Sequence, residues 1–458
     1  MLKNIITLSA VAAMATSVMA NTDMESRIDN LEKQVLKLEK KLKKSNKKLN
    51  EVKAHDANDN IKFDIEFRNT VESIEYKDNK TGDTASNDSL LTSRLFLNMG
   101  SAPTENILFK GKLAIYSIWG AHLIHEDKGT KDWSGSSKPS DSIMRIKEAY
   151  VVYNTEVGEQ PLTFSVGRRP ASNGFLANYR ENEETSGSPL AHITNMEVNG
   201  AMVQFDFDRF VEGSYTKLVL GRAHSGEMEG AYGTSGINPF ADKDTLEEDE
   251  NVDFLVVPGV AYSNGQYTAM YEWAHIFNTK GKNLDTNKTS VAAGTADLFS
   301  LGLKVEGIGD EISDFLDETT VFASVGYSSY NADDGYALLS KDNGDSKTGS
   351  SLWLGAIMPD GITDSGKFGI EYNQGSKYWT PMTWAEDTNI GSKIAVRGQA
   401  YEAYWNTNLF GQKNLTSQVR YTHIQHDYTP NINCAGWVAS EPVDITASSL
   451  RLAITYKY

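Results

Sequence analysis

The residues best suited to chemistry lie in one stretch, which begins where an alternating segment ends as Gly167-Arg168-Arg169-Pro170. The polar connection that follows, residues 170–195, carries Arg180 and three carboxylates, those of Glu181, Glu183 and Glu184. Charges of opposite sign that face one another across a water-filled passage create a transverse field, which orders water and passing ions. This combination of residues favours electrostatic control of passage over catalysis.

Basic side chains also recur at alternate positions of the segments expected to form strands. Taken singly, each of these charges is equally compatible with plain solvation in a wide lumen. As a group, a basic wall opposite an acidic loop predicts a constriction. Its expected members are Arg145, Lys147, Arg168, Arg169, Arg180, Glu181, Glu183 and Glu184, and the lumen wall beyond them is expected to carry Arg68, Arg94, Lys110 and Lys112.

Other kinds of site find little support in the sequence. The acidic run from Asp242 to Glu250 lacks the glycine and the ligand spacing of a calcium loop. His423 and His426 are three residues apart, as are His122 and His125, and such residues face opposite sides of a strand. No Cys-x-x-Cys-His haem motif is present, and no Ser, His and carboxylate spacing stands out. We therefore expect no enzyme activity, no metal and no cofactor.

The elements that must position these charges are strands. Between residues 61 and 68, large apolar side chains alternate with charged ones, which gives a strand one apolar and one charged face. A single strand of a water-soluble sandwich would look the same, so the repetition of the pattern decides. About sixteen such segments occur, with lengths near the 9–11 residues that a tilted strand needs to cross a bilayer. They lie near residues 61–72, 89–99, 107–117, 143–153, 162–169, 196–207, 213–222, 253–263, 267–277, 296–305, 319–329, 350–358, 367–376, 396–409, 415–426 and 448–458.

The connections between these segments alternate in length. Short ones include 100–106, 154–161 and 411–414, and long polar ones include 77–88, 118–142, 170–195, 223–251 and 428–446. Short turns at one rim and long loops at the other are typical of bacterial outer-membrane barrels, and an even count of strands places both ends of the barrel in the periplasm. All but one of the 11 prolines fall in turns or loops; Pro258 lies inside a segment and predicts a bulge or a kink. The predicted fold class is all-β, a transmembrane antiparallel β-barrel of about sixteen strands.

The two ends of the sequence agree with an exported barrel. Residues 1–20 have a basic start at Lys3, a short apolar core and small residues before Asn21, which predicts a secretory signal peptide. The last strand alternates from Leu450 and ends on the aromatic Tyr458. Such an end resembles the terminal strand that the insertion machinery of outer-membrane proteins recognises, although those strands usually end in Phe.

Residues 21–54 are expected to form a short α-helical coiled coil in the periplasm, about 40 Å long, and residues 55–60 a hinge before the barrel at 61–458. The second half of this coil is strongly basic. The charges either keep the helix soluble or contact an anionic polymer such as peptidoglycan. The seam of the coil comprises Ile28, Leu31, Val35, Leu38, Leu42, Leu49 and Val52.

The overall charge limits the partners. The chain has 44 Lys and Arg against 61 Asp and Glu, a net charge of -17, which argues against nucleic acid as a partner. Cys434 is the one cysteine, so no internal disulfide is possible.

Two resemblances extend this interpretation. The strand end at Gly167-Arg168 and the following loop resemble those of general porins, sixteen-stranded trimers in which the third long loop folds into the lumen with carboxylates facing arginines. The signal, the coil, His55-Asp56-Ala57 and the strand from Asp59 to Asp64 resemble an uncharacterised family of porin-like Gram-negative outer-membrane proteins with a periplasmic coiled coil and a domain of unknown function. The porin resemblance implies a homotrimer, whereas the coil seam is also compatible with a dimer.

The sequence thus predicts a porin-like outer-membrane channel for passive diffusion of small solutes or ions, in contact with lipid and lipopolysaccharide. The third long loop would form its constriction. Two alternatives remain: a structural anchor tethered to the cell wall through the coil, and a barrel that sheathes a periplasmic partner.

Overall fold

A computed structural model describes residues 61–119, 143–169, 174–183, 186–224, 251–309, 312–363, 365–383, 388–430 and 439–458. The expected signal peptide, coiled coil and hinge lie outside the described residues, as do Glu184, Cys434 and the acidic run 242–250. Residues 61–101 and 106–458 form one compact unit, which is the barrel.

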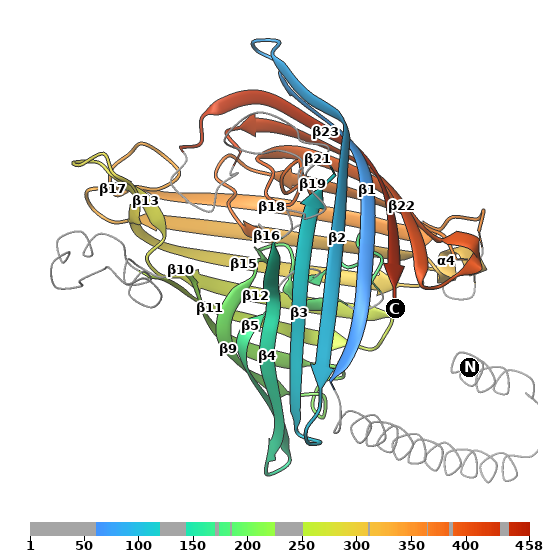
Figure 1. Cartoon of the computed structure of the whole chain (residues 1–458). Coiled ribbons are helices and arrows are strands. Elements are labelled where there is room, and N and C mark those ends of the chain that lie inside the picture. The colour runs from blue at the N-terminus through green and yellow to red at the C-terminus, as the bar shows by residue number, and fades with distance from the viewer. Residues whose placement is uncertain are drawn as a thin grey trace, which may run out of the picture. The chain divides into compact units, whose positions relative to one another are not determined.

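The barrel is a closed antiparallel sheet in which each strand pairs with its neighbours in chain order, and β23 closes on β1 (Figure 1). All sixteen segments expected from the sequence fall on its strands, so the predicted fold is confirmed. The strands are β1 (Lys62–Asp78), β2 (Thr84–Ser101), β3 (Ile107–Ile118), β4 (Met144–Val157), β5 (Gln160–Arg169), β9 (Val198–Asp206), β10 (Tyr215–His224), β11 (Val252–Ser263), β12 (Tyr267–Ile276), β15 (Gly294–Glu306), β16 (Thr320–Ala332), β18 (Ser346–Pro359), β19 (Lys367–Gly375), β21 (Gly398–Asn408), β22 (Leu415–Tyr428) and β23 (Pro442–Lys457).

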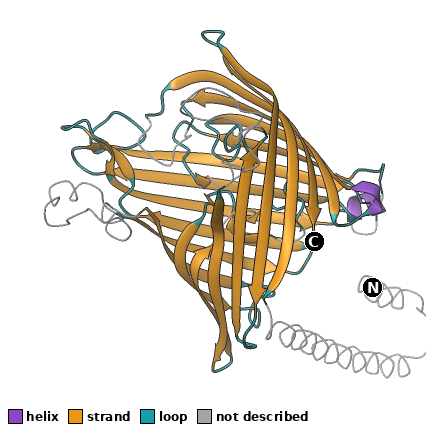
Figure 2. Cartoon of the chain, viewed as in Figure 1, coloured by secondary structure: helices purple, strands orange, loops and turns teal. Residues whose placement is uncertain are grey.

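The remaining elements are short and lie in the connections, and strand makes up the barrel wall (Figure 2). Among the described residues, no helix combines the length and the apolar character needed to cross a membrane. The short elements are β6 (Gly174–Phe175), β7 (Gly187–Leu190), β8 (Thr194–Asn195), β13 (Lys280–Asn283), β14 (Thr289–Ala292), β17 (Tyr336–Ala337), β20 (Met382–Thr383), the helix α4 (Asp314–Asp317) and the 3-10 turn η3 (Leu409–Gly411).

The outside of the barrel is apolar and exposed. Phe63 is 53% exposed and Leu450 54% exposed, although both lie within regular strands. The alternate residues Arg68 and Arg451 are buried inside. Soluble proteins rarely expose a continuous apolar surface of this kind. Within lipid, a closed barrel can have such a surface, because its strands hydrogen-bond all of their backbone N–H and C=O groups to one another. The expected division into lipid-facing and lumen-facing side chains is therefore confirmed on these strands.

The two rims differ as the sequence predicts. Both ends of the barrel chain lie at the rim with the short turns, where Tyr458 and Ile65 exchange two backbone hydrogen bonds. One loop differs from expectation: β1 and β2 have 17 and 18 residues and continue as a hairpin beyond the predicted strand ends, so that their connection shrinks to residues 79–83 (Figure 1).

Pro258 lies inside β11, and the ladder shows its effect. On the β10 side, pairing stops at Thr216–Gly259 and resumes at Val219–Val256, because a proline has no N–H to donate. On the β12 side, the register shifts between Val260 and Tyr262. The predicted irregularity is thus a gap in one ladder and a bulge just after it in the other.

Candidate functional site

The described parts of the connection between β5 and β9 (loop 170–197), residues 174–183 and 186–197, fold into the barrel. Phe175, Leu176 and Leu190 are at most 3% exposed. They share an apolar cluster with Phe322 and Trp353, which the alternation of β16 and β18 places on the inner wall. A loop with only polar side chains would bury too little apolar area to be stable inside the barrel. These three apolar side chains supply the buried area that stabilises the inward position of the loop.

A histidine fixes the same loop to the wall. His192 is fully buried, and its two ring nitrogens lie 2.7 Å from Ser324 Oγ and 3.0 Å from Ser351 Oγ. Because the Ser324 hydroxyl donates to the carbonyl of Leu301, Nδ1 of His192 must donate to Ser324 and Nε2 must accept from Ser351. Burial lowers the pKa of His192 to about 3, so the ring is neutral at physiological pH.

The described parts of a second connection, between β19 and β21 (loop 376–397), are residues 376–383 and 388–397, and they fold inwards as well. Trp379 is fully buried, and its indole N–H donates to the carbonyl of Ile394 at 2.8 Å. Gly349 lies on the inner face of β18, and its missing side chain leaves room for Trp379. A Cβ at Gly349 would lie 2.3 Å from the backbone nitrogen of Trp379. A larger residue at this position would push the loop away from the wall.

The two inward loops, 170–197 and 376–397, hold each other. β8 pairs in parallel with β20, and the N–H of Met382 donates to the carbonyl of Ile193 at 2.8 Å. Ile193, Trp379 and Met382 share a core with inner side chains of β11, β12, β15 and β16. An apolar core therefore joins both loops to this side of the barrel wall.

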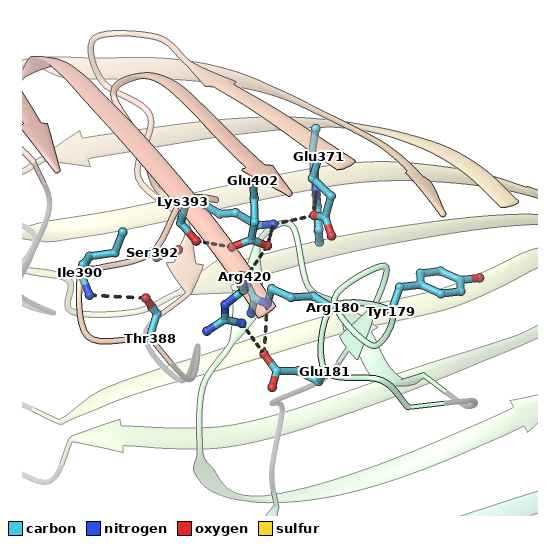
Figure 3. Close-up of polar contacts among 12 residues, drawn as sticks. Tyr179, Arg180, Glu181, Glu371, Thr388, Ile390, Ser392, Lys393, Glu402 and Arg420 are labelled. Carbon is cyan, nitrogen blue, oxygen red and sulfur yellow. Dashed lines mark hydrogen bonds and ion pairs between the residues drawn. The ribbon is translucent and has the colours of Figure 1, made fainter. Parts of the chain in front are cut away.

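A chain of buried charges ties the loops to the neighbouring strands. Lys393 contacts Glu402, and its ammonium lies 2.7 Å from Glu371 (Figure 3). Glu402 lies 3.9 Å from Arg180 of the first loop, and Arg180 lies 3.0 Å from Glu181. The side chains of Lys393, Glu371 and Glu402 are at most 2% exposed, so each charge depends on its partners.

Glu181 is the loop carboxylate that meets the wall. Besides Arg180, it contacts Arg420 of β22 at 3.3 Å and Arg68 of β1 at 3.7 Å. The expected arrangement of a loop carboxylate facing wall arginines is present, but its wall partners are Arg68 and Arg420. Arg168 and Arg169, which the sequence analysis placed opposite the acidic loop, contact other residues.

The other predicted basic residues divide into pairs on β2 to β5. Arg94 pairs with Glu66, and the ammonium of Lys112 lies 2.7 Å from Glu148. Lys147 and Arg168 share Glu197, a carboxylate that the sequence analysis did not select, and the Arg168 contact measures 3.3 Å. Arg169 lies over the ring of Tyr150, with 5.0 Å between the guanidinium carbon and the ring centroid.

Three of the predicted residues do not belong to these ion pairs of the wall. Arg145 and Lys110 are exposed, and no ion pair joins either of them to another described residue. Glu183 exchanges two hydrogen bonds with Asn178 through its own backbone N–H and carbonyl, and so closes a turn of the loop. Its main-chain role is structural.

Several residues of the site were missed at the sequence level. Arg420 and Glu402 occupy inward positions of expected strands, and the alternation rule used for Arg68 would have found them. The loop at 376–397 carried a different signal: Tyr378-Trp379-Thr380-Pro381-Met382 is far more apolar than a solvated loop. The sequence around Lys393 gives no indication of its buried ion pairs, because its partners lie on β19 and β21.

The inner wall thus has two unlike halves. Toward β11–β18 the loops pack apolar side chains against the wall and leave almost nothing exposed. Toward β1–β5 the facing groups are charged and partly exposed, with side-chain exposures of 24% for Lys112, 21% for Glu197 and 37% for Arg168. Partial exposure of these paired charges means that water reaches this half.

The two histidines of β22 lie as alternation predicts. His423 and His426 face opposite sides of β22, as the sequence predicts: Thr422, Ile424 and His426 are buried while His423 contacts Ser448. Within the described ranges, no group of three or more His, Cys, Asp or Glu residues is arranged to hold a metal ion.

Comparison with known proteins places this chain in context. The family described as "Protein of unknown function (DUF3373)" matches residues 84–454. No curated protein sequence matches the chain. Among solved structures, the anion-selective porin from Comamonas acidovorans has a TM-score of 0.48 and 14% identity, covering 87% of this chain and 99% of that one. OprB of Pseudomonas putida has a TM-score of 0.47 and 10% identity, and the match covers 87% of this chain and 94% of that one. The outer-membrane channel DcaP of Acinetobacter baumannii has a TM-score of 0.44 and 14% identity, and the match covers 87% of this chain and 97% of that one.

Proposed function

Because the chain belongs to the DUF3373 family, whose description assigns no activity, we propose a function from its own structure: a passive channel for small solutes or ions in the outer membrane of a Gram-negative bacterium. The apolar exterior and the even number of strands fit such a membrane. The observation that carries the proposal is the charged, partly exposed half of the inner wall on β1–β5. A barrel that served only as an anchor would need no water-facing charges inside.

The constriction of this channel is formed by loop 170–197, with loop 376–397 supporting it. Glu181 lies directly against Arg68 and Arg420, at 3.7 and 3.3 Å, so these ion pairs hold the loop to the wall beside the passage. Lys147, Arg168 and Glu197 extend the charged lining, whereas Arg180 is buried behind it. The apolar core behind the loops keeps their position fixed, so that the width does not depend on loop motion.

The surroundings of the barrel follow from the same proposal. The exterior contacts lipid and, in the outer leaflet, lipopolysaccharide. Self-association as a homotrimer, or as a dimer through the coil at 21–54, and contact of the basic coil with peptidoglycan are further proposals. Tyr458 at the end of the last strand serves as the insertion signal. The anchor and sheath functions remain second candidates that depend on the coil or on a partner.

Covalent blocking tests the channel directly. In a Cys434→Ser background, Lys112→Cys places a thiol at the charged inner wall, and Leu452→Cys places one on the lipid-facing exterior. A bulky, charged methanethiosulfonate reagent should reduce the conductance of single Lys112→Cys channels in planar bilayers and leave Leu452→Cys channels unchanged. Absence of conductance steps from the purified parent protein would overturn the proposal, and so would equal insensitivity of both variants.

A further inference from the structure

The pairing of charges on the inner wall is unequal. Glu197 is shared by Lys147 and Arg168, and Glu66 is shared by Arg94 and Lys457. Each of these carboxylates therefore meets two cations.

At the loop one carboxylate likewise meets several cations, whereas Lys393 meets two carboxylates, Glu371 and Glu402. The carboxylate of Glu181 contacts the guanidinium groups of Arg180 and Arg420 (Figure 3). A third guanidinium group, that of Arg68, lies 3.7 Å from it. Arg180 also reaches Glu402, which is already paired with Lys393. Of the described carboxylates that face this half of the lumen, Glu148 has a one-to-one partner in Lys112.

An aromatic side chain brings the cations of the wall together. Phe96 on β2 is 5% exposed. The centroid of its ring lies 4.2 Å from the guanidinium carbon of Arg94, 5.3 Å from the ammonium of Lys112 and 5.9 Å from that of Lys147. The negative face of an aromatic ring attracts cations but carries no net charge, so it holds them side by side without neutralising them. Arg169 over Tyr150 repeats this arrangement nearby, with no carboxylate paired to it among the described residues.

This excess runs against the composition of the chain. The whole protein has a net charge of -17, so a random inner surface would be acidic. The partly exposed surface toward β1–β5 is instead basic. Charge of one sign in a narrow, low-dielectric passage raises the local concentration of counter-ions, here anions.

We infer that the channel is selective for small anionic solutes, and that the cations around Glu197 and Phe96 determine this selectivity. The inference rests on the proposed channel function and names its substrate class. If a unit charge in the passage has an electrostatic energy of about one RT, the concentration of anions there exceeds that of cations roughly sevenfold. The preference therefore appears as a several-fold permeability ratio.

The reversal potential of wild-type channels tests the inference. The purified full-length protein is inserted into planar bilayers with a roughly tenfold KCl gradient, whose dilute side keeps electrostatic screening weak. The expected reversal potential has the sign of chloride permeating several-fold faster than potassium. A potential of zero or of the opposite sign overturns anion selectivity while the channel function stands. Absence of conductance steps overturns the channel function itself.

Neutralising variants assign the selectivity to residues. Glu197→Gln removes one carboxylate and is expected to increase the chloride preference, whereas Arg168→Gln is expected to decrease it. Lys341→Gln is the matched control, because Lys341 is 77% exposed and pairs with the exposed Glu441 of an outer loop. If the control changes the reversal potential as much as Arg168→Gln, or if Glu197→Gln lowers the chloride preference, the assignment to this wall is wrong. The wild-type measurement remains decisive should a variant fail to fold.

Discussion

At the scale of single residues, Lys393 shows how the site is held. Its ammonium joins Glu371 of β19 and Glu402 of β21, and none of the three side chains is more than 2% exposed. Additional donors satisfy the carboxylates: Trp353 donates to Glu371 and Thr422 donates to Glu402, each at 2.8 Å. Removing the lysine leaves two buried carboxylates without their main cation.

We therefore predict that Lys393→Met destabilises the barrel by about 3–5 kcal/mol, the cost of an uncompensated buried charge. The free energy of unfolding in urea, followed by tryptophan fluorescence in lipid vesicles, measures this loss. Lys341→Met is the control, because its exposed pair with Glu441 is screened by water and should leave the stability unchanged. Equal stability of the two variants would show that the buried network does not hold the loops.

The residue scale also shows the limit of sequence reasoning. Alternation placed Arg68, Arg94 and Lys112 inside, because the side chains of a strand point alternately to its two faces. Lys147 lies at a register shift of β4, so alternation alone does not place it beside the inward Glu148. Alternation could not pair these residues, because partners such as Glu197 and Glu181 come from a loop whose path no periodicity describes. Arg168, for example, contacts Glu197, which the sequence pattern did not indicate as its partner.

At the scale of elements, strands and loops differ in how far sequence defines them. All sixteen strands were predictable, since each repeats one rule over many residues. The inward fold of loop 170–197 was expected from resemblance to porins, whereas that of loop 376–397 was not expected. The position of this second loop depends on a match between Trp379 and inner-wall glycines on other strands, Gly326 and Gly349, which is a tertiary property.

That match leads to a prediction for Gly349→Ala. The added methyl group would lie 2.3 Å from the Trp379 backbone nitrogen, so the loop must shift, at a cost of about 1–3 kcal/mol. Trypsin should then cleave after Lys393 faster than in the wild type, because the buried lysine becomes accessible. Gly100→Ala provides the control, since a Cβ there meets nothing within 4 Å and no effect is expected. Unchanged cleavage in Gly349→Ala would mean that the loop does not depend on this glycine.

At the scale of the whole molecule, the barrel combines an occupied half and a hydrated half of the inner wall. The apolar cores toward β11–β18 resemble those of a soluble domain and give the loops a rigid support. The charged half toward β1–β5 carries the proposed passage. In the proposed channel, an acidic chain presents a basic surface to solutes, because a few strands and one loop form the lining and the average composition does not determine it.

The barrel closes through described strands alone, without the predicted coil. The ladder between β1 and β23 runs from Glu66–Lys457 to Asp78–Ile445, so the wall closes with residues after 61 alone. We therefore predict that deletion of residues 21–54, with the export segment retained, leaves the single-channel conductance and the reversal potential unchanged. In the same preparations, co-sedimentation with peptidoglycan and the mass of the oligomer report on the coil. Loss of either in the deletion variant assigns cell-wall contact or assembly to the coil. Loss of conductance would instead show that the passage requires the coil, contrary to a lining built from β1–β5 and loop 170–197.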